Sequence, residues 1–135
     1  MSRRLILTVL LAVATAAPLH AETVSSQLQT LTAQARSENP AFAGFSAARG
    51  QTFFTSLHGN DWSCSSCHTK NPMQSGKHAV TGRVIQPMAP AANPERFTDS
   101  AKTEKWFRRN CKDVVSRECS AQEKGDVLTW LQSLK

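Results

Sequence analysis

The sequence predicts an all-α domain, and three observations carry that prediction. Apolar residues recur at helical spacing in several segments. Side chains that cap helices stand before the later segments, as at Ser120 to Glu123. No strand-like alternation flanks the one tight cysteine pair, Cys64 and Cys67, which lies between the helical segments. The length of the chain suits a single domain, expected to span residues 22–135.

Residues 1–21 have the pattern of a secretory signal peptide. Arg3 and Arg4 precede an apolar run over residues 5–17, small residues follow, and Ala21 is the expected last residue before cleavage. This run is too short to span a bilayer comfortably. We therefore expect a periplasmic protein, not an integral membrane protein, in a compartment where spare cysteines oxidise.

Two helices are expected before the cysteine pair. The first covers about residues 27–36, with Leu28 and Leu31 as its apolar positions, and Asn39-Pro40 ends it. The second is predicted from apolar residues that fall near helical spacing, namely Phe42, Phe45, Ala48, Phe53 and Leu57.

Two further helices are expected after a long loop. Residues 69–94 contain four prolines and little periodicity, which predicts a loop that wraps around a bound group. A third helix follows, capped by Thr98 or Ser100 and ending at about Val115. The last helix starts at the capping box of Ser120 and has an apolar side made of Val127, Leu128, Trp130, Leu131 and Leu134.

The segment Cys64-Ser65-Ser66-Cys67-His68 is a C-x-x-C-H motif, the attachment sequence of a c-type haem. Its two thiols can form thioethers with the haem vinyl groups, and His68 can bind the iron from one face. A zinc site would need a second tight ligand pair, which the sequence lacks. A thioredoxin-like dithiol would need a βαβ pattern around it. One covalent haem c is therefore the predicted cofactor.

The other two cysteines, Cys111 and Cys119, are expected to form a disulfide in an oxidising compartment. The short loop that it closes predicts a stabilisation of roughly 2–3 kcal/mol. Without Arg3 and Arg4 the chain has fourteen basic and ten acidic residues, or about +4. No basic run is interleaved with aromatic residues, so nucleic-acid binding is not expected. This excess of positive charge is equally consistent with binding to an acidic redox partner and with ordinary solubility.

The arrangement resembles a class I cytochrome c. In that fold a glycine and an aromatic residue on the first main helix cross an aromatic position on the last, and Gly50 with Phe53 or Phe54, against Trp130 and Leu131, resembles this pair. The chain departs from class I cytochromes c at the second axial ligand, because it lacks the methionine that usually follows the motif histidine later in the sequence. The residues alone leave four candidates open, His58, His78, Met88 and Asn110, whereas Met73 is too close to the motif to reach round the haem edge.

A more specific resemblance involves Pro87-Met88-Ala89-Pro90, residues 96–99, residues 104–106, Arg109-Asn110-Cys111 and Cys119. These residues resemble the signature of the sphaeroides haem protein (SHP) family, small asparagine-ligated, oxygen-binding bacterial c-type cytochromes, and are similar to cytochrome c'' of methylotrophs. The resemblance implies haem attachment through Cys64, Cys67 and His68, a disulfide between Cys111 and Cys119, and Asn110 as the distal ligand. It also implies a dihaem cytochrome c and a membrane cytochrome b as redox partners. Met88, where both families usually have leucine, stays an alternative distal ligand.

An amide oxygen is a weak, hard donor that should bind ferric iron better than ferrous iron. We therefore expect reduction to release Asn110 and to open the haem to dioxygen, nitric oxide or carbon monoxide. A simple electron shuttle with permanent six-coordination is the first alternative. An enzyme acting on peroxide or nitrogen oxides ranks last, because the sequence offers no clear distal acid or base. Secondary candidates are Lys77, Arg83 and Arg109 as partners of the haem propionates, and Trp106 as a distal pocket residue.

Overall fold

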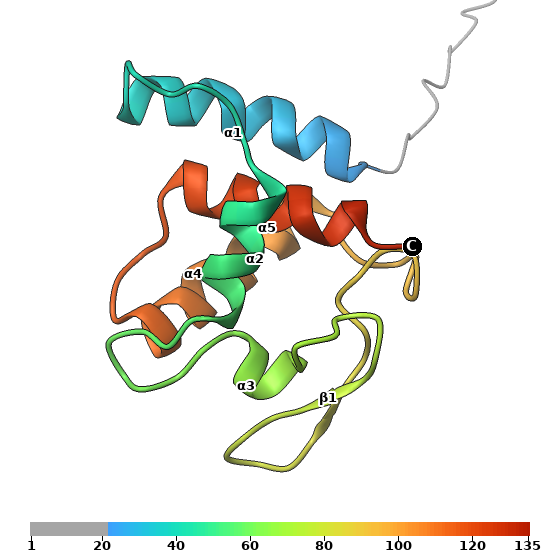
Figure 1. Ribbon diagram of the computed structural model, residues 1–135. Coiled ribbons are helices and arrows are strands. Elements are labelled where there is room, and N and C mark those ends of the chain that lie inside the picture. Colours follow the sequence, from blue (N-terminus) through green and yellow to red (C-terminus); the bar gives the residue numbers. More distant parts are fainter. Residues whose placement is uncertain (1–21) are drawn as a thin grey trace, which may run out of the picture.

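The computed structural model describes residues 22–135, and the predicted signal peptide lies outside this range. The described part contains five helices and one short hairpin (Figure 1): α1 Val24–Glu38, α2 Ala47–Thr55, α3 Ser65–His68, β1 Gly76–Lys77, β2 Val84–Ile85, α4 Ser100–Val115 and α5 Ala121–Ser133. The predicted all-α fold is confirmed. Among residues 22–135, no helix has both the length and the apolar character that crossing a membrane requires.

Side-chain caps determine where the helices begin. The predicted capping box at α5 is confirmed, since the Ser120 hydroxyl accepts from the backbone N–H of Glu123 and the Glu123 side chain accepts from that of Ser120. The expected cap of α4 is wrong: Asp99, rather than Thr98 or Ser100, accepts from the backbone N–H of Lys102 at 2.8 Å. A carboxylate at this position also interacts favourably with the helix dipole.

Helix α5 forms the centre of the core, and α1 and α2 pack on it (Figure 1). One apolar cluster joins α1 to α5 through Val24, Leu31, Ala35, Ala121 and Leu128. A second joins α2 to α5 through Phe54, Val127, Trp130 and Leu131. The second cluster also receives Cys64 and Met88, so it forms one wall of the region around the cysteine motif.

The predicted crossing of α2 and α5 is confirmed, with Phe54 as its aromatic partner. A Cβ atom at Gly50 would lie 2.0 Å from the backbone oxygen of Asp126, so only glycine permits this approach. The Phe54 and Trp130 rings lie 5.1 Å apart. Phe53 instead packs against His58, at 4.7 Å between ring centroids.

Gly50→Ala is expected to destabilise the fold by about 3 kcal/mol or more, because the added methyl group meets backbone that belongs to another helix. Guanidinium unfolding measures this loss. Gln51→Ala, at an exposed position on the same helix, is the matched control and is expected to change stability by less than about 0.5 kcal/mol. Equal stabilities for the two variants would contradict the tight crossing.

The predicted loop over residues 69–94 contains an antiparallel hairpin that its sequence pattern does not predict. Gly76 pairs with Ile85 and Lys77 with Val84. Beyond the hairpin, the backbone N–H groups of Met88 and Ala89 both donate to the carbonyl oxygen of Pro72. These bonds fold the chain back toward α3. The segment is therefore ordered by its own backbone hydrogen bonds and not by a bound group alone.

Candidate haem site

The C-x-x-C-H motif forms the single-turn helix α3, which lies at the opposite end of the molecule from α1 (Figure 1). The backbone N–H of His68 donates to the carbonyl of Cys64 at 3.0 Å. Ser63, which is buried, supports the start of the turn, since its hydroxyl accepts from the backbone N–H of Ser66. The two cysteines and the histidine are thus carried on one rigid turn.

Both motif cysteines are unpaired thiols and half-buried. Burial raises the pKa of the Cys64 thiol to about 11, so this group is protonated at neutral pH. The backbone N–H of Ala79, beyond β1, lies 3.4 Å from the Cys67 sulfur and donates to it. The hairpin therefore contacts the motif through a sulfur atom that thioether formation would involve.

His68 has the properties of a metal ligand. Burial lowers its pKa to about 4, and the positive charge of Arg96 adds to this effect. The imidazole is therefore neutral at pH 7, which is the form that binds a metal. Its Nδ1 atom is buried and has no hydrogen-bond partner among the described residues. Together with two free thiols on the same turn, this donor set fits a covalently attached haem.

Gly76 allows the hairpin to lie directly against the motif. A Cβ atom here would lie 2.0 Å from the carbonyl oxygen of Cys67 and 3.0 Å from the Cα atom of His68. Real Cβ atoms do not come this close to backbone.

Gly76→Ala is expected to push the hairpin away from α3 and to lower the yield of covalent haem. The pyridine haemochrome absorbance per protein measures haem content, and we expect a loss of about half or more, since several kcal/mol of overlap must be relieved. Lys77→Ala changes the next, exposed residue and serves as the control. Full haem loading of both variants would contradict this role.

Arg96 belongs to the family signature, but its place at the site was not predicted from the sequence. Its Nε and Nη2 atoms donate to the backbone oxygens of Pro87 and Gln86 at 2.9 and 2.7 Å. The four ion pairs within residues 22–135 do not include it. It is half-buried, and its charge acts on His68. A half-buried cation without an acid beside the haem-attachment turn suits a haem propionate better than the surface residues Lys77 and Arg83 do.

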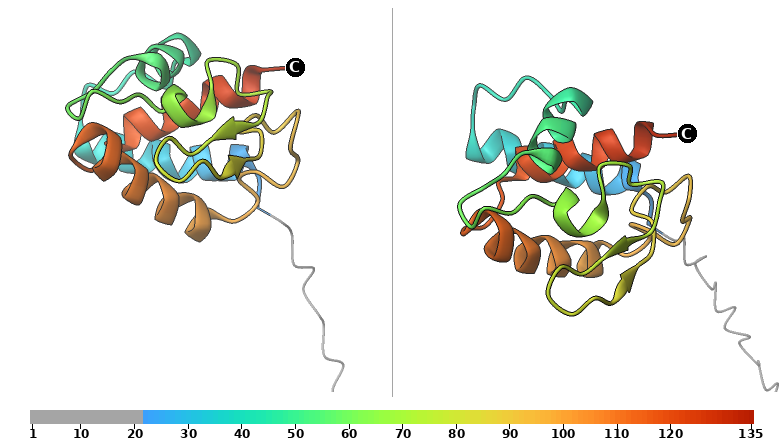
Figure 2. Two further views of the ribbon diagram at one scale, coloured as in Figure 1. Left: turned by 90° about the horizontal axis from the view of Figure 1, so that it is seen from below. Right: turned by 60° about the horizontal axis from the view of Figure 1, so that its bottom comes forward.

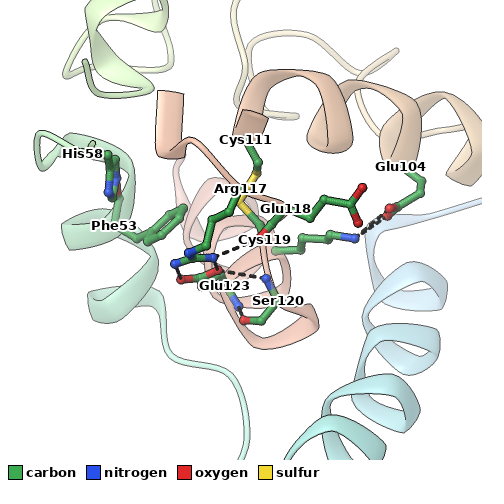
Figure 3. Close-up of a disulfide and its surroundings, with 10 residues drawn as sticks. Phe53, His58, Glu104, Cys111, Arg117, Glu118, Cys119, Ser120 and Glu123 are labelled. Atoms are coloured by element: carbon green, nitrogen blue, oxygen red, sulfur yellow. Dashed lines mark hydrogen bonds and ion pairs between the residues drawn. A yellow bond between two sulfur atoms is a disulfide. The ribbon is translucent and has the colours of Figure 1, made fainter. Parts of the chain in front are cut away.

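The predicted distal residue, Asn110, lies on α4 and is half-buried. The next residue, Cys111, is joined to Cys119 by a disulfide, which connects α4 to the start of α5 (Figure 3). Around this bridge Arg117 forms two hydrogen bonds to the Glu123 carboxylate, at 2.7 and 2.8 Å. The helix is thus held immediately after Asn110 by a covalent bond and an adjacent ion pair.

Helix α4 has two further attachments to the rest of the domain. The ammonium group of Lys124, which is almost fully buried, contacts both oxygens of Glu104 (Figure 3). The Asn60 side chain donates to the backbone oxygen of Asp113 at 2.8 Å. Asn60 belongs to the loop just before the motif, so this bond connects the haem-attachment segment to the helix that carries Asn110.

The ion pair of Glu123 gives a stability that depends on pH. Its hydrogen bond with Arg117 is the main cause that lowers the pKa of Glu123 below 4.5. A lowered folded-state pKa stabilises the fold above the unfolded pKa, and this contribution disappears as the pH falls through the folded value. Glu123→Gln is therefore expected to lose about 1–2 kcal/mol at pH 7 and progressively less below pH 4. A loss that is independent of pH in urea unfolding would contradict this assignment.

The other candidate distal residues are engaged elsewhere. The Nε2 atom of His58 lies 2.8 Å from the carbonyl oxygen of Phe53. The Nδ1 atom of His78 accepts from two backbone N–H groups within the hairpin. Met88 packs on the Phe54 and Trp130 cluster as an apolar side chain.

The same cluster lies near the proximal ligand, since the Phe54 ring lies 6.1 Å from the ring of His68. It also includes Phe107 of α4, so packing on this cluster does not assign Met88 to one face of the haem. Trp106 is 46% exposed, one helical turn before Asn110, and the guanidinium of Arg109 lies 5.7 Å from its ring.

Comparison with known proteins decides the family. A family model described as "Domain of unknown function (DUF1924)" matches residues 40–131. Cytochrome c'' of Methylophilus methylotrophus is 40% identical over 101 residues, which cover 72% of this chain and 70% of that protein. The cytochrome c-type protein SHP of Cereibacter sphaeroides is 43% identical over 98 residues, which cover 70% of this chain and 75% of that protein. The chain belongs to the DUF1924 family and to the SHP and cytochrome c'' family. It is therefore a c-type cytochrome with a covalently attached haem c.

Solved structures of this cytochrome family agree with the fold. Oxidised SHP, an oxygen-binding cytochrome c, superposes with a TM-score of 0.74 at 36% identity, covering 83% of this chain and 97% of that one. Oxidised cytochrome c'' from Methylophilus methylotrophus gives a TM-score of 0.75 at 34% identity, and the match covers 83% of this chain and 94% of that one. A solution structure of the same cytochrome c'', concerned with haem-ligand detachment, gives a TM-score of 0.73 at 35% identity. The match covers 82% of this chain and 93% of that one.

Proposed function

We propose that this cytochrome is a periplasmic electron-transfer protein whose haem binds a small gas only after reduction. In this proposal Cys64 and Cys67 hold the haem, His68 is the permanent axial ligand, and Asn110 is a second ligand to ferric iron. The bound haem supplies a one-electron couple and an axial position for dioxygen, nitric oxide or carbon monoxide. Family membership with an oxygen-binding cytochrome c supports the gas-binding part.

The position of Asn110 carries the gating part of the proposal. The amide is half-buried on α4, directly before a disulfide that connects this helix to α5. A neutral amide oxygen binds ferric iron weakly and ferrous iron more weakly still. With haem bound, Asn110 would leave when the iron is reduced, while the bonds at Cys111, Glu104 and Asp113 would keep its helix in place for its return. The study of haem-ligand detachment in cytochrome c'' is consistent with such a step.

Rapid mixing of the reduced protein with gases distinguishes the three function classes. We expect stable adducts with carbon monoxide and nitric oxide that form without loss of the haem spectrum. Slow oxidation by dioxygen without an adduct would favour a simple electron shuttle. Repeated turnover of peroxide would favour an enzyme.

A further inference from the structure

The positive charge of this protein is concentrated on one helix. Of the fourteen basic residues in 22–135, five belong to α4, whereas this helix has two of the ten acidic residues, Glu104 and Asp113. Helix α4 thus accounts for +3 of the total of +4, and the remaining surface is nearly neutral. The five residues, called the α4 cationic face below, are all exposed: Lys102, Lys105, Arg108, Arg109 and Lys112.

Most of these charges have no acidic partner in the described structure. The ion pairs of residues 22–135 use Arg49, Lys112, Arg117 and Lys124 as their cations. Of the α4 cationic face, only Lys112 is paired, with Glu118 at 3.4 Å between two exposed side chains. Such a pair is weak and easily exchanged. Glu104 is the acidic residue of α4 nearest the middle of this face, and it already forms an ion pair with Lys124.

The spacing of these residues produces a continuous stripe. Lys102, Lys105, Arg109 and Lys112 follow one another at intervals of three or four residues, so they lie on one side of the helix over about 15 Å. Both views in Figure 2 show α4 at the edge of the molecule. The side of α4 that bears Cys111 and Phe107 faces the core, and Asn110 lies between the two sides.

We propose that the α4 cationic face docks the acidic surface of an electron-donating protein next to the haem. This inference rests on the proposed function, because the docked donor supplies the electron that releases Asn110. A membrane surface fits less well. Helices that lie on membranes bury a whole apolar face in the lipid, whereas Trp106 is the one large apolar side chain that α4 exposes and Phe107 is packed in the core. Complementary charge would raise the association rate and orient the donor toward α4.

Reduction of the ferric holoprotein by reduced flavodoxin, an acidic one-electron donor, tests this inference. One electron leaves the reduced flavin of this probe and converts the ferric haem to the ferrous form, and stopped-flow absorbance records the rate. At about 10 mM ionic strength we expect Lys105→Glu to slow the reaction roughly fivefold, with the difference largely lost at 0.5 M. Arg36→Glu makes the same charge change at an exposed position of α1 and is expected to alter the rate less than about 1.5-fold.

Equal effects of Lys105→Glu and Arg36→Glu would overturn the inference, because net charge and not the α4 face would then set the rate. Binding of the protein to phosphatidylglycerol vesicles that is lost in Lys105→Glu, with an unchanged flavodoxin rate, would identify a lipid surface and would also overturn it. The ferrous and carbon monoxide spectra of both variants check the proposed function separately. They are expected to match the parent protein, so a failure of gas binding is distinguishable from a failure of docking.

Discussion

Asn110→Met is expected to close the reduced haem to gases. A thioether sulfur is a soft donor that favours ferrous iron, so the ligand would stay on the reduced iron where the amide leaves. The reduced variant should show a six-coordinate, low-spin spectrum. Its carbon monoxide affinity should fall by about 100-fold, or roughly 2.7 kcal/mol, because the gas must now displace a strong ligand. Carbon monoxide titration followed by visible absorbance measures both effects.

Asn110→Leu makes the opposite change at the same position. The ferric variant should lose its protein-derived sixth ligand and become high-spin, while its ferrous carbon monoxide affinity should stay within about threefold of the parent protein. Arg108→Met, a thioether introduced at an exposed position of the same helix, is the matched control and should leave both spectra unchanged. An unaltered ferric spectrum in Asn110→Leu would assign the distal position to another residue, with Met88 the first to examine.

Removing the disulfide is expected to affect both stability and ligand return. Cys111 and Cys119 are eight residues apart, so in the chain-entropy model Cys111→Ser with Cys119→Ser loses about 2.5 kcal/mol. For a domain of this size that loss lowers Tm by roughly 10 °C. Because Cys111 directly follows Asn110, we also expect a smaller low-spin fraction in the ferric protein. Thermal unfolding followed by haem absorbance and circular dichroism measures the first effect, and ferric EPR measures the second.

A variant that destabilises the same region without breaking the disulfide separates the two roles of the disulfide. Glu123→Gln weakens the neighbouring Arg117 ion pair but leaves the covalent bond after Asn110 intact (Figure 3). It should lower stability while the ferric EPR spectrum stays that of the parent. If the double serine variant also retained the parent EPR spectrum and gas affinity, the disulfide would contribute stability alone and its positioning role would be refuted.

The sequence predicted those features of the fold that depend on local chemistry. The α5 capping box is local, because Ser120 and Glu123 are three residues apart and bond each other. The Gly50 crossing was predictable because the class I cytochrome c arrangement requires a small residue there, and the overlap with Asp126 shows why. The cofactor was predictable because thioether attachment requires the compact motif of Cys64 to His68.

Features that depend on contacts distant in sequence were not predicted. The surroundings of Arg96 arise from carbonyl oxygens about ten residues away in a loop without periodicity. The fit of Gly76 against Cys67 depends on how the chain turns back after α3, which composition does not reveal. The cap of α4 was misassigned because Thr98, Asp99 and Ser100 are all good capping residues, and only the geometry selects Asp99.

The visible spectrum of the protein after reduction with dithionite, in the absence of any gas, tests the central claim most directly. If Asn110 leaves on reduction, the ferrous haem should be five-coordinate and high-spin, with a broad Q-band region. It should convert to a sharp low-spin spectrum when carbon monoxide is added. A six-coordinate, low-spin ferrous spectrum before any gas is added would contradict redox-gated ligand release and would make the protein a simple electron carrier.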